Sequence, residues 1–580
     1  MSRSDGGYSP KKAYPPPLRR HPLLRKGAGE RKDFMKSKKI ILILLFAVTA
    51  AILTAGFNNI RAESANEEPI IINRLLKKSP MKNPLPKNSP PEDYDGYRSL
   101  YDREKGFKVD LPVGTKLDFS LHPGFVRAEG NGFTAIISRE WSQSDDVSEF
   151  IRYYFNRFAV NPNYCEKNGI TILEDSSDWR TDILSLKLAA LPENGFDTYT
   201  YVFFKTENRT FYRIMIKYNS GNAAVPKYIE RMRESFRYFK SEGKAVYSAE
   251  YKPVLPDNWT AETRALYDEI TNSDTVKWGI FVSDPKGKGI DESIPKLEER
   301  LDVNFEIPLI YVHLDGRFPA EYMKKCRDQG KVVELTYQLT RTNNMDRFGF
   351  SQSLYIYTQG FCDEIRRFAR EAAEFGSPFL FRLNNEMNSD WVSYGGVVNL
   401  SDPDIYIYVW RKIYGIFQEE GVNNAIWIFN PNDEDYPPAG WNDAHAYYPG
   451  DEYVQLFGVT GYNTGTYYEN NPAERWRSFY DIYRETEDRF GKTFGRFNWI
   501  ITEFASSSVG GDKPNWIREM FRDLDKFPQI KAAVWFSFAD YDSRPGKNGV
   551  PARIYWLVEN NETLDAFRDG LAEYRARHVK

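Results

Sequence analysis

The sequence predicts an α/β protein, in which a (β/α)8 TIM barrel is preceded by a small α+β domain and an N-terminal transmembrane helix. Three observations predict this fold. Eight strand-like apolar runs alternate with helical segments over residues 273–580, and such alternation is typical of a parallel barrel. Shorter strand-like runs with two helical segments occupy residues 93–241. A charge-free apolar stretch covers residues 40–57 and is long enough to cross a bilayer as a helix.

These patterns divide the chain into six parts. A Lys- and Arg-rich tail precedes the apolar stretch, and a Pro- and Lys-rich stretch follows it. The latter has no sustained hydrophobic periodicity, which is typical of a linker. The predicted parts are a basic cytoplasmic tail at 1–39, a transmembrane anchor or signal segment at 40–57, a linker at 58–92, an α+β accessory domain at 93–241, a connector at 242–272 and the barrel at 273–580.

The apolar segment 40–57 also predicts where the protein is located. Lys36, Lys38 and Lys39 directly precede it, and positive charge favours the cytoplasmic side of a membrane. We therefore expect a single-pass protein of the cell membrane whose later domains are extracellular. The alternative is a chain that starts at Met35, because its first residues then resemble a signal peptide and the domains are secreted after cleavage.

Composition excludes several classes of function. A net charge of −3 provides no basic field for nucleic acid. Cys165, Cys326 and Cys362 are widely scattered, with neither the spacing of a zinc site nor the density of a disulfide framework. The acidic run 433–435 is expected to be a solvated loop and not a calcium site. The oligomeric state stays open.

The barrel prediction depends on eight apolar runs of strand length. A doubly wound sheet is the alternative, but neither a Gly-x-Gly-x-x-Gly turn nor a phosphate loop follows any of these runs. We therefore favour the barrel. The expected strands are 277–281, 309–313, 332–337, 379–383, 425–429, 456–462, 499–502 and 532–536.

Two of these strands lead into a carboxylate. The fourth, 379–383, precedes Asn385 and Glu386, and the seventh, 499–502, precedes Glu503. The C-terminal ends of barrel strands meet at one face, so the two carboxylates are expected to lie close together. One protonated and one ionised carboxyl group are what a retaining glycoside hydrolase needs. A chain with 16% aromatic residues and 13 Trp suits that reaction, because aromatic rings stack on sugars.

Residues near the two carboxylates are candidates for substrate binding. Asn385 is adjacent to Glu386 and is expected to hydrogen-bond a substrate hydroxyl, and Arg382 provides a fixed charge that keeps nearby carboxylates ionised. Trp391 follows the fourth strand, where a ring can stack on a sugar. His313 ends the second strand and is expected to hydrogen-bond the substrate or its neighbours, because no second His at metal-ligand spacing accompanies it. Neither a metal nor a cofactor is predicted.

The barrel carries several motifs in order along its strands: Arg382, Asn385-Glu386-Met387-Asn388, Trp391, Tyr447-Tyr448-Pro449-Gly450-Asp451-Glu452-Tyr453-Val454, Gly458-Val459-Thr460-Gly461-Tyr462-Asn463 and Ile501-Thr502-Glu503-Phe504. Together they resemble glycoside hydrolase family 26, the β-mannanase family of clan A, over residues 276–571. The resemblance implies that Glu386 is the acid/base, that Glu503 is the nucleophile and that Tyr462 hydrogen-bonds the nucleophile. It also implies that Trp535 on the last strand stacks under the bound sugar.

Two departures from that family leave the substrate open. Its β-mannanases usually carry His directly before the acid/base, where this chain has Asn385, and Thr336-Tyr337-Gln338 stands where Thr-Trp-Glu is common. The expected activity is a retaining endo-β-glycanase that cleaves a β-1,4-linked polysaccharide or oligosaccharide at the cell surface. The substrate is either β-mannan or the cell's own exopolysaccharide, such as a β-glucan or cellulose-like polymer. A non-catalytic glycan-binding protein with the same barrel is the alternative from another class.

Overall fold

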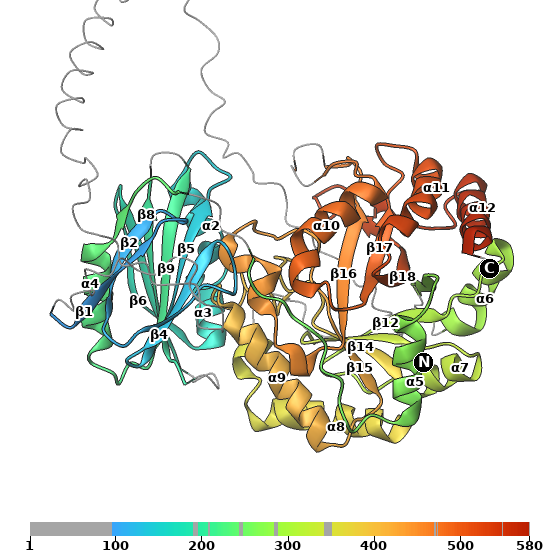
Figure 1. Ribbon diagram of the computed structural model, residues 1–580, viewed down its shortest axis with the longest axis horizontal. Helices are drawn as coiled ribbons and strands as arrows, with labels where there is room; N and C mark the ends of the chain where they lie inside the picture. Colours follow the sequence, from blue (N-terminus) through green and yellow to red (C-terminus); the bar gives the residue numbers. More distant parts are fainter. Residues whose placement is uncertain are drawn as a thin grey trace, which may run out of the picture.

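The computed structural model describes residues 95–578 except 190–194, 207–208, 243–246, 284–287, 342–350, 469–470, 472–473 and 548. An antiparallel β domain and a barrel lie side by side (Figure 1). The apolar segment 40–57 falls outside the described residues. Within those residues, we find no helix of the length and apolar character that crossing a membrane requires.

The accessory domain is built on a seven-stranded antiparallel sheet with the strand order β3-β4-β5-β9-β8-β7-β6. A smaller sheet, β1-β2-β10, lies beside it. Alternate side chains of β8 enter different cores: Tyr201 and Phe203 join one cluster and Val202 joins the other. The elements are β1 (Tyr97–Asp102), β2 (Phe107–Pro112), β3 (Lys116–Asp118), β4 (Phe125–Gly130), β5 (Phe133–Trp141), α2 (Val147–Arg157), α3 (Pro162–Asn168), β6 (Ile170–Ser177), β7 (Thr181–Leu188), β8 (Thr198–Lys205), β9 (Thr210–Tyr218), α4 (Val225–Ser235) and β10 (Arg237–Tyr238).

The predicted barrel is confirmed, because eight parallel strands close in chain order from β11 to β18. Gly279 on β11 is required by the neighbouring strands, since a Cβ there would lie 2.5 Å from the Ile307 carbonyl oxygen and 2.7 Å from Val534. Each expected strand overlaps an observed one. The strands are β11 (Lys277–Val282), β12 (Ile307–His313), β13 (Glu334–Gln338), β14 (Phe379–Leu383), β15 (Ala425–Phe429), β16 (Leu456–Asn463), β17 (Trp499–Ser506) and β18 (Ile530–Ser537).

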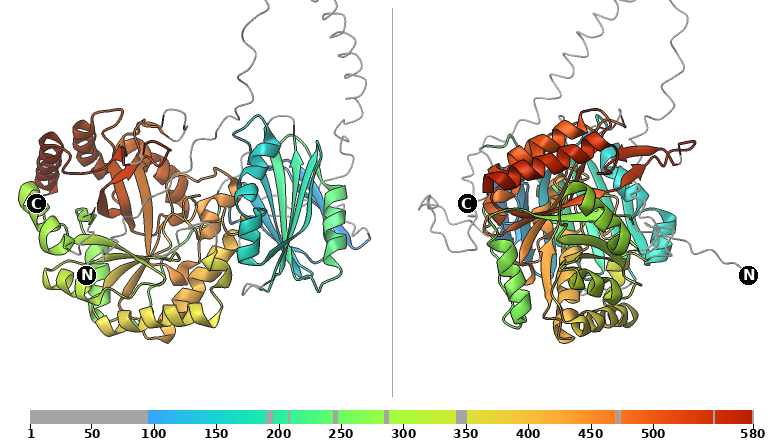
Figure 2. Two further views of the ribbon diagram at one scale, coloured as in Figure 1. Left: turned by 180° about the vertical axis from the view of Figure 1, so that it is seen from behind. Right: turned by 90° about the vertical axis from the view of Figure 1, so that its right-hand side faces the viewer.

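Helices surround the barrel on its outer side (Figure 2). Their starts follow local rules: Asp402 caps α9 with Pro403 in its first turn, and Ser478 and Asp481 form a capping box on α10. A short hairpin of β19 (Ala539–Tyr541) and β20 (Pro551–Ile554) follows the last barrel strand. The helices are α5 (Ala261–Thr271), α6 (Ile294–Leu301), α7 (Ala320–Asp328), α8 (Gln359–Phe375), α9 (Pro403–Glu419), α10 (Phe479–Phe494), α11 (Lys513–Asp523) and α12 (Asn561–His578).

One hydrophobic cluster is shared by the two domains. On the accessory side it includes Tyr199 and Tyr201 from the large sheet, and on the barrel side Val398, Leu400 and Trp441. The barrel residues come from the segments after β14 and β15, at the C-terminal ends of the strands. One face of the accessory sheet therefore packs against the same end of the barrel that carries the two candidate carboxylates (Figures 1 and 2).

Candidate active site

Glu386 stands in a sharp turn just after β14. Asn384 and Glu386 both have positive φ angles, 48° and 57°, which are unfavourable for residues other than glycine. Two hydrogen bonds hold the turn: the amide of Asn384 donates to the Tyr337 carbonyl (2.9 Å), and the amide of Glu386 donates to the Asn430 carbonyl (2.8 Å). The neighbouring strands β13 and β15 therefore fix the backbone that carries Glu386.

Both carboxylate oxygens of Glu503 are held by neighbouring side chains. Its Oε1 accepts a hydrogen bond from the Tyr311 hydroxyl (2.5 Å) and lies 2.7 Å from Nη1 of Arg382. Its Oε2 accepts a hydrogen bond from the Tyr462 hydroxyl (2.7 Å). A cation and two hydroxyl donors favour the charged form of a carboxylate. This is the form that a nucleophile needs.

A register shift in the sheet aims the Glu503 side chain. Along the β16–β17 pair, Val459 lies opposite Ile501 and Thr460 lies opposite Glu503, so Thr502 has no counterpart on β16. Such bulges re-aim side chains and are common next to active sites. The Glu503 side chain is fully buried.

Asn385 connects the two carboxylates. It directly precedes Glu386, and its Nδ2 lies 3.4 Å from Oε1 of Glu503. Its Oδ1 accepts hydrogen bonds from Gln338 (2.9 Å) and from the hydroxyl of Tyr394 (2.9 Å), which fixes the orientation of the amide. The structure thus brings Glu386 and Glu503, predicted from separate strands, into one site.

Burial and charge set the protonation of the groups around Glu503. Burial, and then the charge of Glu503, raise the pKa of Tyr311 and Tyr462 well above the ordinary value of tyrosine. Burial alone would lower the pKa of Arg382, but Glu503, Tyr311 and Glu334 together raise it. Both hydroxyls therefore stay protonated and can donate, and Arg382 stays charged.

Trp391 contacts the predicted acid. Its Nε1–H donates to Oε2 of Glu386 at 2.6 Å, and its ring lies against Tyr436 with 5.0 Å between ring centroids. The indole is almost fully buried. The hydrogen bond of Trp391 to Glu386 is observed, and its contact with the substrate stays a prediction.

The predicted contact between Arg382 and the substrate stays a prediction. Its side chain is fully buried inside the barrel, where Nε donates to Thr336 (2.6 Å) and Nη1 donates to Asn430 (3.1 Å). The observed partners of the guanidinium are therefore side chains of the barrel. Its other predicted role, as a charge beside a carboxylate, agrees with its ion pair to Glu503.

The prediction that Trp535 stacks under a sugar is wrong. Its ring packs against Trp516 of α11 and Phe567 of α12, so it faces the helices. Consecutive residues of a strand point to opposite faces, and the next residue, Phe536, faces the interior. Its ring stacks on Phe281 with 4.5 Å between centroids. The inward-facing residue at this point of β18 is therefore Phe536, one position after the predicted one.

The acidic run 433–435 is not the solvated loop that we expected. Each of its carboxylates forms an ion pair, and the partners of Asp433, Glu434 and Asp435 are Arg477, Arg475 and Arg489, each at 2.6 Å. The loop is therefore fixed to α10 and the segment before it. Among the residues that the structure describes, no group of His, Cys, Asp or Glu is arranged to hold a metal ion.

Other predicted and unpredicted residues surround the carboxylates. His313 is partly exposed at the end of β12, and its Nδ1 shares a hydrogen bond with Thr340 (2.5 Å). Tyr311 was not predicted from the sequence, although Tyr311 and His313 lie two apart and so point to the same side of the strand. Glu334, which lies 3.1 Å from Nε of Arg382, was not predicted either. Burial raises the pKa of Glu334 to about 8, although Arg382 opposes the shift.

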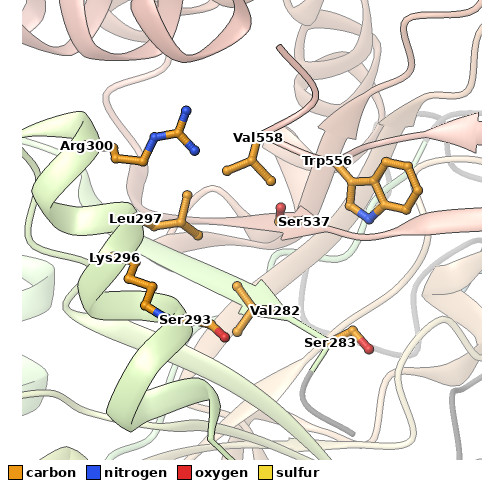
Figure 3. A pocket seen from close by; sticks show the side chains of 9 residues that line it. All are labelled: Val282, Ser283, Ser293, Lys296, Leu297, Arg300, Ser537, Trp556 and Val558. Carbon is orange, nitrogen blue, oxygen red and sulfur yellow. The ribbon is translucent and has the colours of Figure 1, made fainter. Parts of the chain in front are cut away.

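A separate pocket of about 280 Å³ opens beside the barrel (Figure 3). Val282 and Ser537, at the ends of β11 and β18, form one wall, and Leu297 and Arg300 of α6 form another. Its lining differs from the residues that hold Glu386 and Glu503. The carboxylate site is therefore defined by its hydrogen bonds and not by this pocket.

Comparison with known proteins supports the nature of this site. Residues 350–485, which include Glu386 and the strands on either side of its loop, match the sequence profile of glycosyl hydrolase family 26. The barrel is similar to that family. The resemblance predicted from the motifs is therefore confirmed. Glu503 lies beyond the matched residues, so its assignment depends on the geometry described above.

Individual relatives carry names of the same kind. Endoglucanase H of Acetivibrio thermocellus is 27% identical over 267 residues, which are 45% of this chain and 28% of the relative. A mannan endo-1,4-beta-mannosidase of Bacillus subtilis is 31% identical over 97 residues, which are 16% of this chain and 25% of the relative. The chain thus spans about a quarter of the length of the curated relatives that it matches. Among solved structures, the catalytic domain of the Bacillus sp. JAMB-750 GH26 endo-beta-1,4-mannanase is 17% identical with a TM-score of 0.41, over 56% of this chain and 93% of that one.

Proposed function

We propose that this family 26 barrel is a retaining endo-β-glycanase that hydrolyses a β-1,4-linked polysaccharide, with Glu503 as nucleophile and Glu386 as acid/base. One observation carries the proposal: Glu503 is held by Arg382, Tyr311 and Tyr462, next to a second carboxyl group that a turn and Trp391 hold in place. Two carboxyl groups in contrasting surroundings are what this chemistry requires.

The reaction proceeds in two steps at these groups. Glu503 attacks the anomeric carbon while Glu386 gives its proton to the departing glycosidic oxygen, and a covalent glycosyl-enzyme forms. Glu386, now a carboxylate, then removes a proton from water, which displaces Glu503. Arg382, Tyr311 and Tyr462 orient the attacking carboxylate, and Asn385 lies where a substrate hydroxyl would meet both groups.

Two classes of substrate fit the proposal. β-Mannan is favoured by the family and by a relative named as a mannan endo-1,4-beta-mannosidase. A β-glucan or cellulose-like polymer is favoured by the longer match to a relative named Endoglucanase H and by Asn385, which stands where β-mannanases usually carry His. A non-catalytic glycan-binding protein with this barrel is the alternative, and two retained carboxylates count against it.

Hydrolysis tests the proposal directly. The full chain is incubated with mannan, glucomannan, mixed-linkage glucan, cellulose and xylan, and reducing ends are measured. The Glu503→Gln variant is the matched control, because it removes the nucleophile and keeps the shape of the side chain. Release of reducing ends by the wild type alone supports the proposal, and proton NMR of the first product decides the mechanism. The β-anomer supports retention, and the α-anomer would overturn it. Binding without hydrolysis would instead support the glycan-binding alternative.

We also propose that the protein is anchored in the cell membrane through residues 40–57, with the barrel outside the cell. The support is the charge-free stretch and the lysines before it. Protease added to intact cells should then cleave the linker 58–92 and release the active domains. Domains protected until the membrane is broken would refute the orientation, and active protein free in the medium with a new N-terminus near Glu63 would support signal cleavage.

A further inference from the structure

The segment after Glu386 is buried between the barrel and the accessory domain. Residues 384–402 connect β14 to α9 without a strand or an α-helix, and every one of them is buried. Buried irregular backbone needs hydrogen-bond partners. The accessory domain provides several: Tyr164 donates to the Val398 carbonyl (2.5 Å), and Arg213 donates to the Ser401 carbonyl (2.7 Å). The fold of this segment therefore depends on both domains.

The accessory domain also holds two strained residues of this segment. Leu400 and Ser401 have φ angles of 58° and 50°, which branched and polar side chains adopt only when their surroundings impose them. The carbonyl of Leu400 accepts a hydrogen bond from the Tyr201 hydroxyl, and that of Ser401 accepts one from Arg213. Both donors lie on the accessory sheet. Without it, these residues are free to relax.

A buried charge network fixes the end of the segment to the same sheet. Lys217 lies 2.8 Å from Asp402 and 2.5 Å from Asp404, and all three side chains are buried or nearly so. Arg127 forms a second ion pair with Asp404 (2.5 Å). Separating such a network leaves charges buried without partners. Breaking the contact is therefore costly, unlike the loose attachment of a mobile binding module.

The start of the segment links the accessory domain to the catalytic acid. Asp390 is buried, its Oδ2 accepts a hydrogen bond from Tyr154 (3.2 Å), and it lies 3.7 Å from Nη1 of Arg157. Both partners belong to α2 of the accessory domain. The next residue in the chain is Trp391, whose indole donates to Glu386 (2.6 Å). The interdomain contact and the side chain that orients the acid thus belong to consecutive residues.

We propose that the accessory domain is a fixed part of the catalytic apparatus, and that Asp390, held by Tyr154 and Arg157, is a positioning residue that sets Trp391 against Glu386. The inference rests on the proposed function, because it assigns a role within that active site. It gives the accessory domain a task in the reaction, although both proposed catalytic carboxyl groups come from the barrel.

Sensitivity to the leaving group tests this proposal. A phenyl glycoside needs its departing oxygen protonated by Glu386, whereas a 2,4-dinitrophenyl glycoside does not. We compare kcat/KM of the full chain on both, using the sugar that the wild type releases from polysaccharide. The test variant is Arg157→Met, whose partner Asp390 is adjacent to Trp391. The matched control is Arg127→Met, which breaks another interdomain ion pair, and its partner Asp404 is not adjacent to Trp391.

The expected result is a selective loss. Arg157→Met should lower kcat/KM for the phenyl glycoside by about 10- to 100-fold, the cost of a small misplacement of a catalytic group, and change the dinitrophenyl value much less. Arg127→Met should change both values by the same factor. Equal changes in Arg157→Met would overturn the proposal, since a merely structural role lowers both. Tyr154→Phe, which removes a single oxygen, provides the same comparison if Arg157→Met does not fold. A wild type inactive on every glycoside would instead refute the proposed function.

Discussion

Replacing Lys217 with Met tests how firmly the accessory domain is docked on the barrel. Lys217 lies on β9, and its Nζ donates to both carboxylate oxygens of Asp402 (2.8 and 3.0 Å) and to Asp404 (2.5 Å). The side chains of Lys217 and Asp402 are fully buried, and that of Asp404 is 10% exposed. Methionine keeps most of the aliphatic length and removes the charge.

The expected cost is about 3–5 kcal/mol of unfolding free energy, because removal of one partner leaves a buried charge uncompensated. Asp404 retains its ion pair with Arg127, and the Tyr199 hydroxyl still donates to Asp402 (3.1 Å). We therefore expect a value near the lower limit, about 3 kcal/mol. Most of this cost comes from Asp402, because Lys217 is its charged partner.

Urea unfolding of the full chain, followed by tryptophan fluorescence, measures this cost. Lys187→Met is the control: its Nζ lies 4.0 Å from Asp197 and its side chain is 46% exposed, so a change below about 1 kcal/mol is expected. The double variant with Asp402→Asn should be more stable than the sum of the single changes, because it neutralises the unpaired carboxylate. A loss in Lys217→Met no larger than that of the control, or strictly additive changes, would refute the reasoning.

Three further predictions concern the barrel. Glu503→Ala and Glu386→Ala should each lower polysaccharide hydrolysis by several orders of magnitude with the fold intact. Azide should rescue only Glu386→Ala on an aryl glycoside with a good leaving group, because azide replaces the base and no acid is needed. Near-normal turnover in either variant would contradict the proposed roles. Burial raises the pKa of Glu334 to about 8, above its unfolded value of about 4.3, so the stability that this group contributes is full below about pH 4 and is lost as the pH rises through 8. Glu334→Gln, which cannot ionise, should therefore gain stability relative to the wild type between pH 5 and pH 9, by up to about 5 kcal/mol, and parallel pH profiles of urea unfolding would exclude this. Trp535→Phe should lower the unfolding free energy by about 1–3 kcal/mol, because the hydrogen bond from its Nε1 to the Tyr555 carbonyl is lost. The same variant should leave KM unchanged. A raised KM would instead support the predicted sugar contact.

The sequence by itself determined the barrel and its two carboxylates. Strands of a parallel barrel are buried on both faces and appear as continuous apolar runs, so the runs that end near Glu386 and Glu503 were visible without a structure. Their meeting at one face follows from the topology, because the C-terminal ends of all eight strands lie together. Tyr462 was found through a motif, and its hydrogen bond to Glu503 is observed.

Only the tertiary structure decided which neighbours complete the site. The direction in which Trp535 or Phe536 faces depends on a single step of strand register, and that step is set by pairing across the barrel. Tyr311 reaches Glu503 from a strand far away in the chain, a contact that no local pattern encodes. The contacts between the accessory domain and residues 384–402 are likewise not encoded locally. Arg213 and Lys217 bind that segment across a long separation in sequence. Local patterns record which face of an element is buried, whereas the partner buried against it is chosen by packing of the whole chain.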